Sequence, residues 1–176
     1  LTGQGQPLRV GDIVPIGGFN PTGDASHDVS NVSDYREDIP IDVTLGYQAS
    51  SFESFMLKRF FASDYRVTPA ADRMGFRLEG RPVTSTIHTM HSEGIALGAI
   101  QCPPDGQPII MMRDRQTIGG YPKLGCVAPY DIDRLSQITP GKSVSFNYVS
   151  VESARANMLL IERGYKRLGA QFLDFK

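Results

Sequence analysis

A tight turn between two short apolar runs, near the middle of the chain, constrains the fold more than any other feature of this sequence. Pro104 presets the first central position of the turn, Asp105 tolerates the second, and Gly106 supplies a positive φ. The runs on either side, residues 99–102 and 107–112, are short, apolar and free of helix-capping residues. They are therefore expected to pair as the two strands of a β-hairpin.

A loop dense with charged, amide and glycine residues follows the hairpin. The apolar pattern stops after Met112, and residues 113–123 read Arg-Asp-Arg-Gln-Thr-Ile-Gly-Gly-Tyr-Pro-Lys. Polar groups that a rigid scaffold holds on a loop are commonly functional. The sequence thus predicts a scaffold with a candidate site beside it.

The rest of the chain reads as many short strands with few helices. Besides the hairpin, strands are expected at 7–16, 41–48, 65–68, 75–79, 82–86, 124–128 and 143–149, and helices at 52–61, at 131–138 and after Ser150. Ser50 and Glu53 have capping-box spacing ahead of the first helix, which is expected to run for about three turns. This pattern predicts a mainly β fold, a closed or nearly closed β-barrel with two or three helices.

Composition argues against several classes of partner. The chain has 18 basic and 19 acidic residues, a formal charge of -1 and no run of like charges, so neither a nucleic-acid groove nor an electrostatic membrane anchor is indicated. No long hydrophobic span or secretion signal supports membrane insertion or export. Cys102 and Cys126 lie in apolar runs, where reduced, buried thiols are expected, so a cytoplasmic protein fits best.

Three smaller patterns favour structural over chemical roles. His88 and His91 lack a third ligand and lie in a strand-like stretch, so no metal site is predicted. The pair Gly119-Gly120 lacks the Lys and Ser or Thr of a phosphate loop and is interpreted as a tight turn. Cys102 has no histidine in evident partnership, so a catalytic thiol is not expected.

Five motifs, in the same order over residues 71–123, resemble the second half of the allophanate hydrolase subunit 2 family, also called the carboxyltransferase subdomain A/B family. They are Ala71-Asp72-Arg73-Met74-Gly75-Phe76-Arg77-Leu78-Glu79-Gly80, Ser92-Glu93-Gly94, Gly98-Ala99-Ile100-Gln101, Pro103-Pro104-Asp105-Gly106-Gln107-Pro108 and Asp114-Arg115-Gln116-Thr117-Ile118-Gly119-Gly120-Tyr121-Pro122-Lys123. The family includes the C subunit of bacterial 5-oxoprolinase, the antagonist of a sporulation kinase inhibitor and part of urea carboxylase.

The resemblance implies a cyclophilin-like β-barrel that works with a related subunit 1 protein, with the site near their joint surface. In the 5-oxoprolinase members the family reaction is ATP-dependent opening of the 5-oxoproline lactam to glutamate, together with a third subunit. In urea carboxylase the similar domain transfers a carboxyl group from carboxybiotin to urea. ATP, bound together with the partner subunit, is therefore the expected cofactor, and biotin is expected only for the urea carboxylase reading.

The leading hypothesis is that the chain belongs to an ATP-dependent enzyme that processes an amide or lactam, of the 5-oxoprolinase type. One alternative is the carboxyltransferase domain of a biotin-dependent urea carboxylase. Another is a regulatory module that binds a kinase inhibitor without catalysing a reaction. These alternatives differ in substrate and partner but share the same candidate pocket.

The candidate site residues come from the polar loop and its neighbours. Arg115 and Lys123 are expected to be catalytic, by stabilising negative charge that develops on oxygen. Arg115 has an alternative, an ion pair with Asp114 or Glu79 that closes the barrel end. The side chains expected to bind substrate are Arg73, Gln101, Gln107, Asp114, Gln116, Thr117 and Tyr121.

The resemblance also divides the chain. Residues 1–17 are interpreted as the remnant of a preceding subdomain and 18–40, rich in Gly, Asn, Ser, Asp and Thr, as a linker or long loop. Residues 41–163 are expected to form the barrel domain and 164–176 a C-terminal extension. Because the family's usual first half is absent, the isolated chain is expected to be inactive.

Overall fold

The computed structural model of this chain describes residues 9–13 and 40–173. The chain divides into two units, residues 1–32 and 33–176. In the first unit the described residues form a turn at Gly11, where the amide of Asp12 donates to the Arg9 carbonyl at 3.1 Å. The remaining residues of the interpreted remnant, and the expected linker apart from residue 40, lie outside the described residues.

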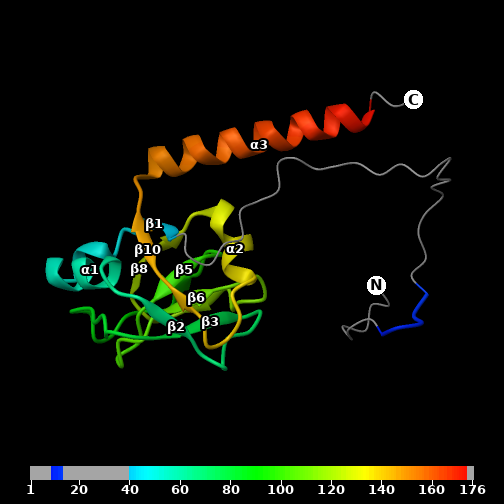
Figure 1. Ribbon diagram of the computed structural model, residues 1–176. Helices are drawn as coiled ribbons and strands as arrows, with labels where there is room; N and C mark the ends of the chain where they lie inside the picture. Colours follow the sequence, from blue (N-terminus) through cyan, green and yellow to red (C-terminus); the bar gives the residue numbers. More distant parts are fainter. Residues whose placement is uncertain (1–8, 14–39, 174–176) are drawn as a thin grey trace. The chain divides into compact units, whose positions relative to one another are not determined.

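The second unit is built around one eight-stranded sheet, in the order β10-β1-β8-β5-β6-β3-β2-β9 (Figure 1). Its strands are β1 Ile41–Leu45, β2 Tyr65–Val67, β3 Gly75–Glu79, β5 Ala99–Gln101, β6 Ile109–Met111, β8 Lys123–Val127, β9 Ser143–Val144 and β10 Phe146–Tyr148. Only Ser145 separates β9 from β10, so both ends of the strand order belong to one continuous stretch of chain. The sheet therefore curls into a nearly closed barrel, which confirms the predicted mainly β fold.

Short helices and a second small sheet complete this unit. The helices are η1 Ala49–Ser51, α1 Ser54–Phe61, η2 Pro129–Asp131, α2 Ile132–Ser136 and α3 Val151–Leu173, and the small sheet pairs β4 Glu93–Gly94 with β7 Ile118–Gly119. Helix α3 continues without a break across residues 163 and 164, the expected boundary between the barrel domain and the extension. Within the part of the chain that the structure describes, no helix is both long and apolar enough to cross a membrane.

Two local predictions were wrong. The first helix begins at Ser54, with Glu53 as its N-cap and no side-chain cap bond, so it spans eight residues instead of three turns, and Ser50 lies in η1. Residues 82–86 form no strand, because the amides of Val83 and Thr86 donate to carbonyls on two different segments.

The hairpin that the sequence predicted is present. Strands β5 and β6 pair antiparallel, with Ile100 opposite Ile110. The amide of Gly106 donates to the Pro103 carbonyl at 2.9 Å, and Gly106 has a φ of +73°. The turn therefore forms through the positive φ that the sequence indicated.

Alternation along these strands separates two faces of the sheet. Ile100, Ile110 and Leu78 belong to the barrel core, whereas their neighbours Ala99 and Met111 pack with Ile95 in a second, smaller apolar cluster. Successive side chains of a strand point to opposite faces, so Gln101 and Arg77 lie on the outward side of the barrel wall. This outward strip of β5, β6 and β3 carries the candidate site.

Candidate functional site

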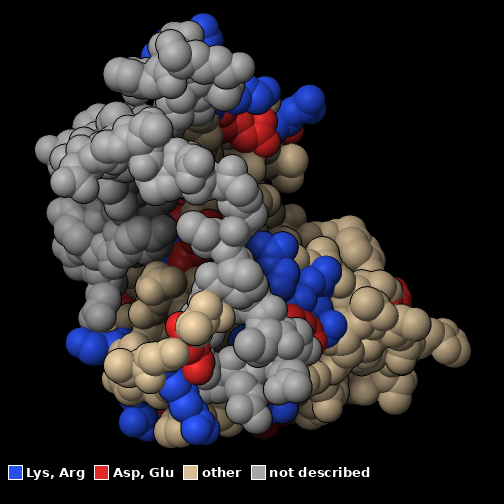
Figure 2. Space-filling model, turned by 90° about the vertical axis from the view of Figure 1, so that its right-hand side faces the viewer, with Lys and Arg blue, Asp and Glu red and all other residues tan. Residues whose placement is uncertain are grey.

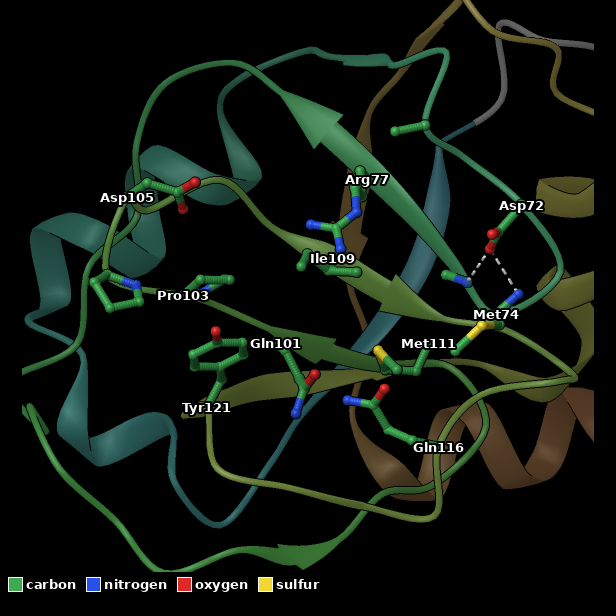
Figure 3. Close-up of a pocket in the computed structure, with 13 residues that line it drawn as sticks. Asp72, Met74, Arg77, Gln101, Pro103, Asp105, Ile109, Met111, Gln116 and Tyr121 are labelled. Carbon is green, nitrogen blue, oxygen red and sulfur yellow. Dashed lines mark hydrogen bonds between the residues drawn. The ribbon is translucent and has the colours of Figure 1, made fainter.

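A pocket of about 400 Å³ lies on the outward face of β5, β6 and β3 (Figure 3). The hairpin turn borders it on one side, and the loop between β6 and β8 borders it on the other. Its lining residues are Ala70, Asp72, Met74, Gly75, Arg77, Gln101, Pro103, Pro104, Asp105, Ile109, Met111, Gln116 and Tyr121. The pocket thus combines an apolar floor with a small set of polar side chains, as small-molecule sites usually do.

Gln101 is the most unusual of these side chains. It is 1% exposed, yet its amide nitrogen Nε2 has no hydrogen-bond partner among the described residues. Its side chain points into the pocket in Figure 3. A buried donor without a partner costs about 1–3 kcal/mol, and such groups are rare in native proteins. Among the described residues that line the pocket, Gln101 is therefore the one with a buried side-chain polar atom that lacks a partner.

The close approach of Gly119 holds this amide in place. A Cβ atom on Gly119 would lie 2.6 Å from Ile95 Cδ1, 3.0 Å from Gln101 Nε2 and 3.5 Å from Gln116 Nε2. A side chain at residue 119 would force the ends of the Ile95 and Gln101 side chains to shift, so the pair Gly119-Gly120 is more than a turn. The side-chain amide nitrogens of Gln101 and Gln116 both lie close to Gly119.

The two acids of the pocket bond to the backbone of their own loops. One oxygen of Asp72 accepts from the amides of Met74 and Gly75, at 2.8 and 3.0 Å (Figure 3). One oxygen of Asp105 accepts from the Gln107 amide at 3.0 Å. These contacts fix the loops that border the pocket.

A second polar cluster surrounds Glu93, next to the pocket. One carboxylate oxygen of Glu93, Oε2, accepts from the Tyr47 hydroxyl, from Gln48 Nε2 at 3.1 Å and from Lys123 Nζ at 3.2 Å. The amide oxygen of Gln48 accepts the backbone amide of Lys123 at 2.8 Å. The Lys123 side chain is 9% exposed, so its ammonium group is held almost entirely by protein.

Electrostatics in this cluster favour a charged Glu93. Hydrogen bonds from Tyr47 and then Lys123 lower the pKa of the Glu93 carboxyl, and the bond to Glu93 raises the pKa of Tyr47. Lys123 is the register partner of Gln101, and Glu93 is that of Gly119. The Glu93 cluster therefore adjoins the pocket through two separate strand pairs.

The predicted substrate-binding residues divide into two groups. Gln101, Gln116 and Tyr121 line the pocket. Gln107 instead pairs with the backbone of Gly80, and Arg73 forms an exposed ion pair with Asp114 at 2.9 Å, outside the pocket. Thr117 is exposed, and its carbonyl accepts the amide of Ile95 at 2.9 Å.

The two residues expected to be catalytic lie outside the pocket lining. Lys123 belongs to the Glu93 cluster. Arg115 donates to the carbonyls of Ile95 at 3.1 Å and Met112 at 3.4 Å, which ties the polar loop to β4. The alternative ion pair of Arg115 was wrong, since Asp114 pairs with Arg73 and Glu79 pairs with Arg66.

Sequence reasoning missed four functional candidates: Arg77, Tyr47, Gln48 and Glu93. Arg77 alternates with the core residues Phe76 and Leu78, and this alternation was the signal that it faces outward. Glu93 lay within a motif that carried the family resemblance, but nothing in the sequence pairs it with Lys123.

Neither the two cysteines nor the described histidines, His88 and His91, form a reactive or metal-binding cluster among the described residues. Both cysteines are free thiols, and burial raises the pKa of Cys102 to about 12, which leaves it protonated and unreactive. Among the described residues, no three His, Cys, Asp or Glu side chains gather as metal ligands. In the view of Figure 2, basic and acidic side chains lie next to each other at several places over the described part.

Comparison with known proteins gives consistent matches. The family model described as "Carboxyltransferase domain, subdomain A and B" matches residues 1–148. The 5-oxoprolinase C subunit of Escherichia coli strain K12 is 32% identical over 152 residues, which cover 86% of this chain and 48% of that protein. The Haemophilus influenzae protein of the same name is 36% identical over 121 residues, 66% of this chain and 39% of its own length.

Solved structures agree with the fold. The structure of TTHA0988 is 29% identical with a TM-score of 0.67, and the match covers 81% of this chain and 27% of that one. The urea amidolyase of K. lactis is 26% identical with a TM-score of 0.61, over 66% of this chain and 8% of that one. The chain thus spans about half the length, or less, of the curated relatives it matches.

Proposed function

Because this chain belongs to the carboxyltransferase subdomain A and B family, we propose that it is part of an enzyme that processes a small amide or lactam. The proposed reaction is of the 5-oxoprolinase type, ATP-dependent opening of 5-oxoproline to glutamate, carried out with a subunit 1 partner. Identities of 32% and 36% to two 5-oxoprolinase C subunits support this assignment.

The free amide nitrogen of Gln101 is the observation that carries the proposal. A lactam carbonyl oxygen gains negative charge when the amide is activated, and a preorganised donor aimed at that oxygen stabilises the charge. Gln101 is buried in the pocket wall and its Nε2 has no hydrogen-bond partner among the described residues, so this donor is proposed to serve the ligand oxygen. Gln116 and Tyr121, on the opposite loop, then orient the rest of the ligand.

Lys123 and Glu93 are proposed to support this step from the adjoining strand. The ammonium of Lys123 supplies positive charge near Gln101, its register partner. Glu93 fixes the position of that ammonium through a contact of 3.2 Å. Arg115 is proposed to act indirectly, by holding the polar loop over the pocket.

ATP is proposed to bind together with the partner subunit. The glycine pair of the polar loop does not fit a phosphate cradle, because the space beside Gly119 is filled by Ile95 and Gln101. A phosphate cradle needs open backbone amides. We therefore propose that this chain binds the amide or lactam substrate, whereas ATP binds together with the partner subunit.

A carboxyltransferase of a biotin-dependent urea carboxylase is the second candidate. Its support is the structural similarity to urea amidolyase and urea carboxylase of K. lactis, each with a TM-score of 0.61. The sequence identity, 26%, is lower than to the 5-oxoprolinase subunits. In this reading the same donors hold the urea oxygen, and biotin is the cofactor.

The test is ATP hydrolysis by the chain, in its full-length parent, mixed with its partner subunits. We expect hydrolysis to depend on 5-oxoproline and to fall at least tenfold in Gln101→Leu, whereas Gln137→Leu, an exposed glutamine at the end of α2, leaves it unchanged. Urea-dependent turnover with carboxybiotin favours the second candidate. Partner binding without any substrate-dependent turnover contradicts both and favours a regulatory module.

A further inference from the structure

Arg77 is a cation of the pocket that the proposed function does not yet use. It lies on the outward side of β3, opposite Ile109 of β6, and its guanidinium points into the pocket in Figure 3. Among the described residues, Arg77 forms neither an ion pair nor a side-chain hydrogen bond. Its charge is therefore available to a ligand.

Among the described residues, none of the nearby acids forms an ion pair with Arg77. Glu79, the next outward residue on β3, pairs with Arg66 at 2.5 Å. Asp72 and Asp105 each bond to amides of their own loops, and neither forms an ion pair with Arg77. A guanidinium in this setting suits a carboxylate, which it can bind through two parallel hydrogen bonds.

The other free groups of the pocket fit a ligand that also carries an amide. Gln101 Nε2 is a buried donor, which requires an uncharged or anionic oxygen. Ile109, the register partner of both Gln101 and Arg77, provides apolar floor between them, which suits methylene groups. The pocket thus presents, in order, a hydrogen-bond donor for a carbonyl oxygen (Gln101), an apolar surface and a cation (Arg77).

We infer that Arg77 is a specificity-determining residue, which binds the carboxylate of a small ligand whose amide carbonyl accepts from Gln101. This inference rests on the proposed function and narrows it to amides that carry a carboxylate. Urea has no carboxylate, so Arg77 gives it no advantage. The residue therefore separates lactam acids from urea-like substrates.

The test compares two ligands that differ only in the carboxylate, 5-oxoproline and 2-pyrrolidinone, by NMR titration of the full chain at pH 7. We expect wild type to prefer 5-oxoproline about tenfold, a modest factor because Arg77 is exposed. Arg77→Gln is expected to abolish the preference without changing the Kd of 2-pyrrolidinone. Gln101→Leu is expected to weaken both ligands by a similar factor.

Arg66→Gln, the matched control, removes a cation of the same barrel wall that is paired with Glu79, and it leaves both affinities unchanged. If Arg77→Gln keeps the preference, or if wild type binds the two ligands equally or not at all, the inference is overturned. The proposed function fails separately, when Gln101→Leu leaves 5-oxoproline-dependent ATP hydrolysis in the complex intact.

Discussion

At the scale of single residues, the site depends on one glycine that allows one glutamine to be buried. Strand alternation directs Gln101 to the outward face of the barrel wall. On that face an amide side chain would normally reach water. The β4–β7 ribbon covers it instead, and Gly119 allows this close approach without displacing the ends of the Ile95 and Gln101 side chains. A buried donor with no partner is thus a consequence of how closely the ribbon packs.

Gly119→Ala is expected to disrupt the pocket. The added Cβ would lie 2.6 Å from Ile95 Cδ1 and 3.0 Å from Gln101 Nε2, so the ribbon or the amide must shift. We expect a loss of about 1–3 kcal/mol in the free energy of unfolding and at least tenfold weaker 5-oxoproline binding, measured by denaturant titration and NMR. Gly94→Ala is the control, because the space beside Gly94 on the partner strand is open. Equal behaviour of the two variants would contradict this account.

The sequence identified part of the site for clear physical reasons. Gln101, Gln116 and Tyr121 were predicted because they flank a rigid hairpin and a polar loop, and both border the pocket. Arg77 and Glu93 were not predicted, since an arginine at an outward strand position is ordinary and a lone glutamate has no partner visible in sequence. Only the pairing of β3 with β6 and of β4 with β7 brings these residues to the site.

At the scale of elements, α1 is held by a single aromatic face. Phe60 is 0% exposed and stacks on Phe146 of β10 at 4.6 Å between ring centroids, with Tyr65 of β2 at 5.5 Å. Phe55, one turn earlier, is 60% exposed and lies beneath Arg59 at 4.5 Å. The helix therefore has a packing side and a solvent side.

Phe60→Ala is expected to destabilise the barrel by about 3–5 kcal/mol, because a large ring is lost from a close-packed cluster. Phe55→Ala, on the same helix, is expected to cost less than about 1 kcal/mol, since it loses only an exposed cation–π contact. Denaturant unfolding of both variants measures the difference. Similar losses would mean that α1 does not pack on β2 and β10 as described.

Elements with local signals were the predictable ones. The turn of the hairpin was predicted from three adjacent residues, Pro104, Asp105 and Gly106. Strand β3 was expected at its observed bounds, Gly75–Glu79. The lack of a strand at 82–86 was not predictable, because the amides of this stretch are satisfied by distant carbonyls. Thr86, for example, donates to the carbonyl of Ser51, a contact that no local pattern indicates.

At the scale of the whole second unit, one short stretch closes the barrel. Residues 143–148 pair antiparallel with β2 at one end and parallel with β1 at the other. Closure removes the exposed strand edges that would otherwise invite pairing with other chains. The chain can then leave the barrel as α3, which begins three residues after β10 ends.

Among the side chains of α3 that the structure describes, residues 151–167, those of the first turns include contacts with the barrel domain. Ala154 is 7% exposed and Asn157 donates to the Tyr130 hydroxyl at 3.3 Å, whereas Leu159, Leu160 and Tyr165 are all more than half exposed. A chain ended at residue 163 is therefore expected to keep its Tm within about 2 °C, because the exposed side chains of the later part of α3 add little stability. Ending the chain at residue 150 removes the packed turns as well and is expected to lower the Tm by several degrees. Thermal unfolding of the two shortened chains beside the full one measures this, and a large loss on shortening to residue 163 would show that residues 164–176 are part of the barrel domain instead of an extension.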